Sequence, residues 1–179
     1  MVAPGGSRWR RKNVVRVGRL NPDGSIQGND NDVDPSPFEP HYREITRNDQ
    51  VEIYEPILKN QAGQVTTGLA AATGYLKDNR LLPSGFQKQT ASQDIAVIGD
   101  AADDPDFVDA SDRIQYSVSL PDARGPFHVE VELWYQPIGY RWAHNLNSYP
   151  AVETQRFVSY YESMKSHSAI VLAHAAANY

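Results

Sequence analysis

Two segments in the second half of the chain alternate regularly between apolar and polar residues. Every second residue is apolar from Arg113 to Leu120, and the same alternation runs from Phe127 to Tyr135. A period of two is typical of antiparallel strands that bury one face. The connection between them contains Pro121, Gly125 and Pro126, which favour a turn. The pattern therefore predicts a hairpin of two half-buried strands.

Weaker strand patterns occur earlier, at Val14–Val17, Val51–Tyr54 and Asp94–Gly99. The first 40 residues are rich in Gly, Pro, Asn and Asp, which favour an extended arm interrupted by turns. The segment from Val65 to Leu82 is compatible with a helix or with two strands, because its glycines weaken a helix.

The period changes to that of a helix after Pro150. The apolar residues there fall near one helical face: Phe157, Tyr160, Tyr161, Met164, Val171 and Leu172. This spacing predicts a helix of about twenty residues at the end of the chain. We expect its apolar face to cover the sheet or a neighbouring subunit.

These elements together predict a mainly β fold. We expect residues 21–179 to form a single antiparallel β-sandwich of Greek-key or jelly-roll type, with an extended N-terminal arm and a C-terminal helix. Residues 1–20 contain six Arg or Lys residues and no acid, and we interpret them as a basic, flexible leader. Docking of this leader on acidic patches or on an anionic membrane is the alternative.

Composition narrows the function classes. The chain has 179 residues, is 40% hydrophobic and carries a net charge of -5, which is typical of a globular protein and argues against nucleic acid as the main partner. No apolar segment has the length of a signal peptide core or of a membrane span. The absence of cysteine excludes disulfides, thiolate chemistry and covalent haem attachment through Cys-X-X-Cys-His. The oligomeric state is not indicated.

A run of oxygen-bearing side chains extends from Asn29 to Asp34. Asp30, Asp32 and Asp34 have the i, i+2, i+4 spacing at which carboxylates on a bent backbone converge on a hard cation. We therefore predict a Ca²⁺ site formed by these three residues, with Asn29 and Asp23 as auxiliary ligands. The EF-hand pattern is only half met, and an exposed polar loop is the alternative.

A second acidic block lies between Asp100 and Asp112, with six carboxylates that could complete this site or form another. An exposed loop explains the block as well. Among the five histidines, none has helical zinc-site spacing, and His41 is the candidate metal ligand because it closely follows the Asp/Asn run.

The segment from Trp134 to Trp142 is rich in aromatic residues. Trp134, Tyr140 and Trp142 could form a platform that stacks on sugars, although packing in a core or interface explains them too. Carboxylate pairs for a hydrolase could be drawn from Glu52, Glu55, Glu130 and Glu132. Glu130 and Glu132, the leading candidates, merely share the polar face of a predicted strand. No nucleophile elbow, phosphate loop or dinucleotide motif occurs.

Five segments together resemble the C-terminal region of bacterial multihaem cytochrome c-like proteins. They are Asn21–Asp32, Phe38–Tyr42, Gln50–Leu58, Tyr75–Phe86 and Tyr135–Trp142. The resemblance covers about residues 20 to 176. It implies a protein that is exported to the periplasm or the extracellular space, in which haem-binding segments precede a region of this kind.

The family's haem ligation cannot be transferred to this chain, because it contains no Cys-X-X-Cys-His. We therefore expect an accessory region of a split or truncated reading frame, with the basic leader where the haem domain would end. The leading hypothesis is a non-catalytic, calcium-stabilised interaction domain that docks with a multihaem cytochrome c-like protein of an electron-transfer system. A carbohydrate-binding module and an uncharacterised hydrolase are the alternatives.

Overall fold

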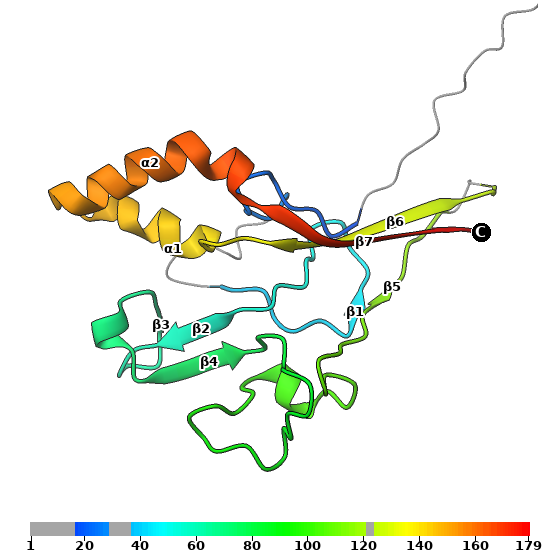
Figure 1. The fold of residues 1–179 in the computed structure, drawn as a ribbon, viewed down its shortest axis with the longest axis horizontal. Helices are drawn as coiled ribbons and strands as arrows, with labels where there is room; N and C mark the ends of the chain where they lie inside the picture. The colour runs from blue at the N-terminus through cyan, green and yellow to red at the C-terminus, as the bar shows by residue number, and fades with distance from the viewer. Residues whose placement is uncertain (1–16, 29–36, 121–123) are drawn as a thin grey trace, which may run out of the picture.

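The computed structural model describes residues 17–28, 37–120 and 124–179. Short strands and 3₁₀ turns occupy the first two thirds of the chain, and a long ribbon with two helices occupies the last third (Figure 1). In chain order, the elements are β1 (Glu44–Ile45), β2 (Pro56–Lys59), β3 (Val65–Thr66), η1 (Leu69–Ala71), β4 (Gly74–Asp78), η2 (Asp100–Asp103), β5 (Gln115–Tyr116), β6 (His128–Tyr135), α1 (Tyr140–Asn145), η3 (Leu146–Ser148), α2 (Val152–Ser168) and β7 (Ile170–Asn178).

The predicted β-sandwich is wrong. The structure is 24% strand and 22% helix, and its strands form three small sheets of two or three strands, none of them closed. The described residues are thus an α/β mixture without two facing sheets. The arrangement of the sheets does not decide whether residues 21–179 form a single domain.

The three-stranded sheet has the order β3-β2-β4 and is antiparallel throughout. The turn between β2 and β3 is held by the Asn60 side chain, which accepts hydrogen bonds from the main-chain N–H groups of Ala62 and Gln64. The strand predicted at Val51–Tyr54 lies instead at β2, which begins at Pro56. Proline is tolerated there because the first residue of a strand need not donate to the ladder.

The hairpin predicted between 113–120 and 127–135 does not form. Only Gln115–Tyr116 of the first segment is a strand, and it pairs in parallel with β1. The second segment is β6, as predicted, but its partner is β7. The alternation identified a strand correctly at β6, whereas it could not identify the partner strand, because the period is the same for every pairing.

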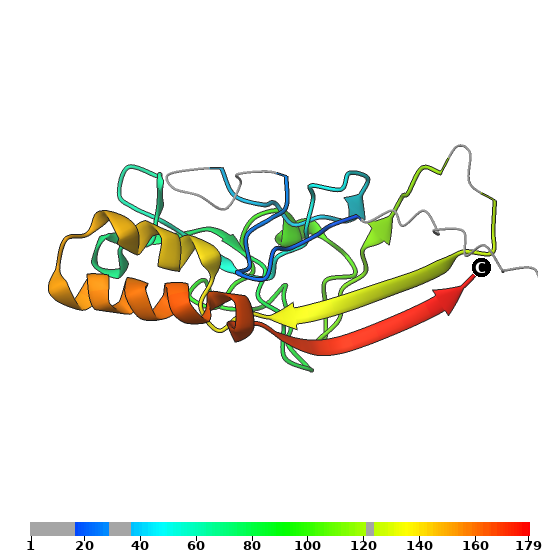
Figure 2. The same cartoon turned by 90° about the horizontal axis from the view of Figure 1, so that it is seen from above.

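The C-terminal helix is confirmed over Val152–Ser168, but it does not close the chain. Val171 and Leu172 belong to β7, which runs antiparallel to β6. β-Branched residues at the start of this segment favour a strand, and main-chain hydrogen bonds to β6 stabilise it. α1 and α2 lie side by side at one end of the ribbon and connect its two strands (Figures 1 and 2).

A small apolar core lies beside the three-stranded sheet. Val97, Ala101 and Phe107 are buried there, and partly buried aromatic and aliphatic residues pack around them: Tyr54, Leu82 and Phe86. The segment predicted as a strand at Asp94–Gly99 contributes a single bridge between Ile98 and Asp78.

Gly99 sets the position of η2 against β4. Its φ of 84° and ψ of -157° lie in a region reserved for glycine, and a Cβ there would stand 3.2 Å from the Leu76 carbonyl oxygen. We expect Gly99→Ala to lower the free energy of unfolding by about 2–3 kcal/mol in urea titrations, because it adds a clash to backbone strain. Gly63 also has a positive φ but has open space around its Cβ direction, so Gly63→Ala reports the strain alone and should cost less.

Candidate functional site

Five polar side chains from distant parts of the chain converge between β1, β4, η2 and β5. His41 precedes β1, Glu52 precedes β2 and Asn79 follows β4 directly. Asp104 follows η2, and Asp112 lies shortly before β5. The side chains of His41, Glu52, Asp104 and Asp112 are at most 3% exposed, so this histidine–carboxylate cluster is almost completely removed from water.

His41 lies at the centre of the cluster, with a carboxylate at each ring nitrogen. Its Nδ1 lies 2.9 Å from Glu52 Oε1, and its Nε2 lies 3.2 Å from Asp104 Oδ2 and 3.9 Å from Asp112 Oδ1. The ring also makes an edge contact with Phe107 at a centroid distance of 5.0 Å. The imidazole is therefore fixed in orientation by ion pairs and by packing.

The carboxylates are oriented by further hydrogen bonds. Asn79 Nδ2 donates to Glu52 Oε1 at 2.7 Å, and the Tyr54 hydroxyl donates to Asp112 Oδ2 at 2.6 Å. Asp104 accepts a hydrogen bond from the Asp106 main-chain N–H and lies 3.3 Å from Arg43 Nε. Hydrogen bonds thus fix the orientation of every side chain in the cluster. Both a ligand-binding site and a purely structural hydrogen-bond network require such fixed orientations.

Burial and charge act in opposite directions on His41. Burial alone would lower its pKa, but the hydrogen bond and charge of Glu52, together with Asp112 and Asp104, raise it above the ordinary value. Burial raises the pKa of the Tyr54 hydroxyl, and its hydrogen bond to Asp112 raises it further, so Tyr54 remains a donor. The carboxylates therefore face hydrogen-bond donors and the imidazole of His41.

Asp106 lies beside Asp104 in the same loop. Its pKa is raised because it shares a hydrogen bond with the Asp104 carboxylate and because it is partly buried. Burial would also raise the pKa of Asp104, but hydrogen bonds from Asp106 and His41 lower it overall.

A second buried charge lies next to the cluster. Lys77 is 2% exposed, and its Nζ donates to the carbonyl oxygens of Glu39 and Ile53, each at 2.8 Å. Glu55 Oε1 lies 3.7 Å from the same ammonium group. Burial lowers the pKa of Lys77, and the charges of Glu55, Glu52 and Glu39 act against that effect.

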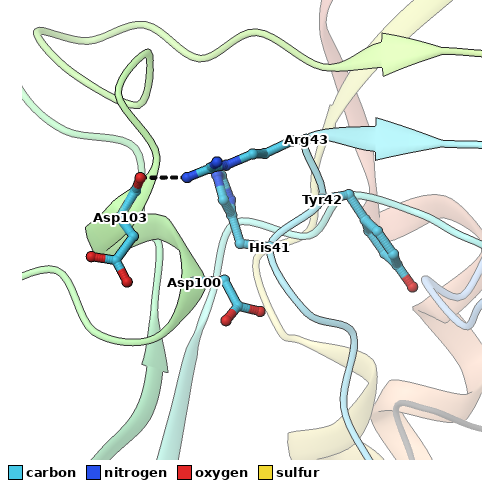
Figure 3. A pocket seen from close by; sticks show the side chains of 5 residues that line it. All are labelled: His41, Tyr42, Arg43, Asp100 and Asp103. Carbon is cyan, nitrogen blue, oxygen red and sulfur yellow. Dashed lines mark hydrogen bonds between the residues drawn. The ribbon is translucent and has the colours of Figure 1, made fainter.

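A hollow of about 380 Å³ opens beside His41 and is lined by Tyr42, Arg43, Asp100 and Asp103 as well. Figure 3 shows the Arg43 guanidinium donating a hydrogen bond to the main-chain carbonyl oxygen of Asp103, while the ring of Tyr42 points to the other side. Of the cluster residues, only His41 lines this hollow.

The calcium site predicted from Asn29, Asp30, Asp32 and Asp34 lies outside the described residues. The fifth predicted ligand, Asp23, accepts hydrogen bonds from the main chain and hydroxyl of Ser25 and lies 3.6 Å from Lys165. Burial alone would raise the pKa of Asp23, but these partners lower it. Asp23 therefore helps to hold α2 against the N-terminal turn.

The candidate aromatic platform is divided between two elements. Trp134 lies on β6, is 40% exposed and donates from its indole N–H to Glu132. Tyr140 and Trp142 lie two residues apart on α1, so they point in different directions. Tyr140 stacks on His144 at a centroid distance of 5.5 Å.

The candidate hydrolase carboxylates lie on the exposed ribbon. Glu130 lies 3.1 Å from His128 Nε2, and Glu132 accepts from Trp134. Among the described residues, neither lines the hollow at His41 or a second hollow of about 280 Å³ beside Leu82 and Phe86. Their exposure gives no support to a hydrolase.

Sequence reasoning singled out His41 as a ligand and the acidic block that contains Asp104, Asp106 and Asp112. It considered Glu52 only as a candidate hydrolase carboxylate and assigned no site role to Asn79 or Lys77. The signal that could have identified Lys77 and Asn79 is a short polar run, Lys77-Asp78-Asn79, at the end of a segment with strand character.

Comparisons with known proteins give no relative: no family model, no curated protein and no solved structure matches the chain. None of the helices in residues 17–28, 37–120 and 124–179 is long and apolar enough to span a membrane.

Proposed function

We propose that this chain is a non-catalytic interaction domain that docks on a protein partner through the β6–β7 ribbon. The observation that carries the proposal is the apolar face of that ribbon. Val129, Val131 and Leu133 are 47%, 48% and 37% exposed, and the register places them opposite Ala177, Ala175 and Ala173 on the same face.

The ribbon has two unlike faces. The face opposite the valines carries His128, Glu130 and Glu132, so alternation along β6 separates apolar from polar side chains. β6 and β7 run alongside each other away from the helices (Figure 2), over a length of about 30 Å for nine residues. A contiguous exposed apolar face of this kind marks an interaction surface.

The free edges of the ribbon support the same interpretation. Among the described strands, β6 pairs with β7 alone and β7 with β6 alone. Such edges can accept a further strand from a partner, because their main-chain groups form a ready template. The partner that we propose is the haem-carrying part of an exported multihaem cytochrome c-like protein, on the strength of the sequence resemblance.

The test uses biolayer interferometry with the purified chain and the product of a neighbouring reading frame that contains Cys-X-X-Cys-His. We expect Val131→Glu to weaken binding at least tenfold, because it places a charge in an apolar interface. Asn178→Glu is the matched control: it adds the same charge on the polar face, across from His128, and should bind like the wild type.

Two results would contradict the proposal: equal binding by the wild type and Val131→Glu, or no binding by either. Light scattering of the chain alone separates a further case. If Val131→Glu abolishes a dimer and leaves cytochrome binding unchanged, the ribbon face binds a second copy of the chain instead of the partner.

A further inference from the structure

The histidine–carboxylate cluster differs from an ordinary buried salt bridge in its excess of negative charge. Glu52, Asp104 and Asp112 are at most 3% exposed, and the half-buried Asp106 adjoins them. Against these four carboxylates stand His41 and the guanidinium of Arg43, whose side chain is 54% exposed. Uncompensated buried carboxylates are strongly destabilising unless a cation neutralises them.

The nearest ammonium groups supply this compensation only in part, because the charge of Lys77 acts on Glu52. Lys77 Nζ donates to the main-chain carbonyls of Glu39 and Ile53. Lys88 Nζ donates to the carbonyls of Ala101 and Asp104. Both ammonium groups thus donate to backbone oxygens, and Lys77 also lies 3.7 Å from Glu55 Oε1.

Three aspartate oxygens of the cluster already lie close to one another, and His41 belongs to a second group that shares Asp112 with them. One oxygen each from Asp104, Asp106 and Asp112 lie within 4.8 Å of one another, and so do atoms of His41, Glu52 and Asp112. His41 Nε2 is 3.2 Å from Asp104 Oδ2 and 3.9 Å from Asp112 Oδ1. Ligands bound to one ion at about 2.0–2.2 Å are about 3–4 Å apart, so binding would draw the aspartate oxygens together and bring Asp106 closer to His41.

The two ring nitrogens of His41 have different surroundings. Nδ1 faces Glu52, which Asn79 holds in place, and this arrangement leaves Nε2 directed at the aspartates. A carboxylate on one ring nitrogen and a metal on the other is the usual environment of a metal-binding histidine, because the carboxylate fixes the ring and its tautomer. A hollow lies on the side of His41 where Arg43, Asp100 and Asp103 gather (Figure 3).

We propose that this cluster is a divalent transition-metal site, with His41 Nε2, Asp104, Asp106 and Asp112 as ligands and Glu52 as the residue that positions His41. One imidazole with three carboxylates suits Mn²⁺ or Zn²⁺, whereas Ca²⁺ takes six to eight oxygen ligands. The ion would join the segments before β1, after η2 and before β5. The site contains no residue of the β6–β7 ribbon.

The first experiment is thermal unfolding of the full chain after treatment with EDTA. We expect Mn²⁺ or Zn²⁺ at roughly 100 times its Kd to raise Tm by about 5–10 °C, because an ion that binds only the folded state stabilises it. Ca²⁺ at the same concentration should raise Tm less. No shift with Mn²⁺ or Zn²⁺ would overturn the proposal.

Substitutions show which residues are needed for the metal-induced rise in Tm. Asp106→Asn and Asp112→Asn should each abolish the metal-induced rise in Tm, whereas Asp100→Asn should retain it, because Asp100 is exposed and lines only the hollow. A variant with Asp30→Asn, Asp32→Asn and Asp34→Asn should also retain it. Loss of the shift in this triple variant, with retention in Asp106→Asn, would refute the assignment.

A spectroscopic measurement on the wild-type chain tests the site without any variant, so the result does not depend on whether a variant folds. Pulsed electron paramagnetic resonance of Mn²⁺ bound to the wild-type chain should show coupling to one imidazole nitrogen. Bound Mn²⁺ without nitrogen coupling would place the ion on surface carboxylates and overturn the site.

Discussion

Replacing Phe107 by alanine should lower the free energy of unfolding by about 3–5 kcal/mol, because the ring is completely buried and its removal leaves a cavity. The ring packs in the core with Val97 and Ala101 and stacks on Tyr54 at a centroid distance of 6.3 Å. It also contacts the edge of His41. The substitution therefore removes packing from the apolar core and from the buried cluster at once, and urea unfolding monitored by circular dichroism measures the loss.

The control for Phe107→Ala is Tyr160→Ala. Tyr160 is an aromatic residue of similar size that is 66% exposed on α2, so its removal should change the free energy of unfolding by less than about 0.5 kcal/mol. A cost below about 1 kcal/mol for Phe107→Ala would show that the core does not depend on this ring.

The local elements could be predicted from the sequence better than their pairing. Alternation marked β6 correctly, and helical spacing marked α2, because both patterns come from short-range geometry. The prediction of a β-sandwich was wrong because a period of two identifies a strand but not the strand that pairs with it. The partner of β6 is β7, whose first residues had been assigned to the C-terminal helix. A two-stranded ribbon satisfies the same alternation as a sandwich strand, although it leaves the apolar face exposed.

Only part of the candidate site could be predicted from the sequence, for the same reason. His41 and the acidic block were visible because each is chemically distinctive on its own. Glu52 and Asn79 are ordinary polar residues in the sequence, and they become part of the cluster only when β2 and β4 pair. Long-range contacts of this kind have no signature in a single segment.

Lys77→Met should destabilise the chain by about 3–5 kcal/mol at neutral pH. The change keeps the length of the side chain but removes the ammonium group that offsets the charge of the buried acids Glu39 and Glu52. It also leaves the carbonyl oxygens of Glu39 and Ile53 without this donor. Urea unfolding at neutral pH measures the cost.

The pH dependence gives a second, signed test of Lys77. Burial lowers its pKa in the folded chain below the ordinary value of 10.5, so above the lowered pKa the unfolded chain binds more protons than the folded chain. The advantage of the wild type over Lys77→Met should therefore be smallest at neutral pH, widen as the pH rises toward 10.5, and stay constant above it. Titratable groups shared by both proteins cancel in this difference. A gap that narrows with rising pH would mean that the ion pair with Glu55, and not burial, governs the ammonium group, because a raised pKa reverses the sign.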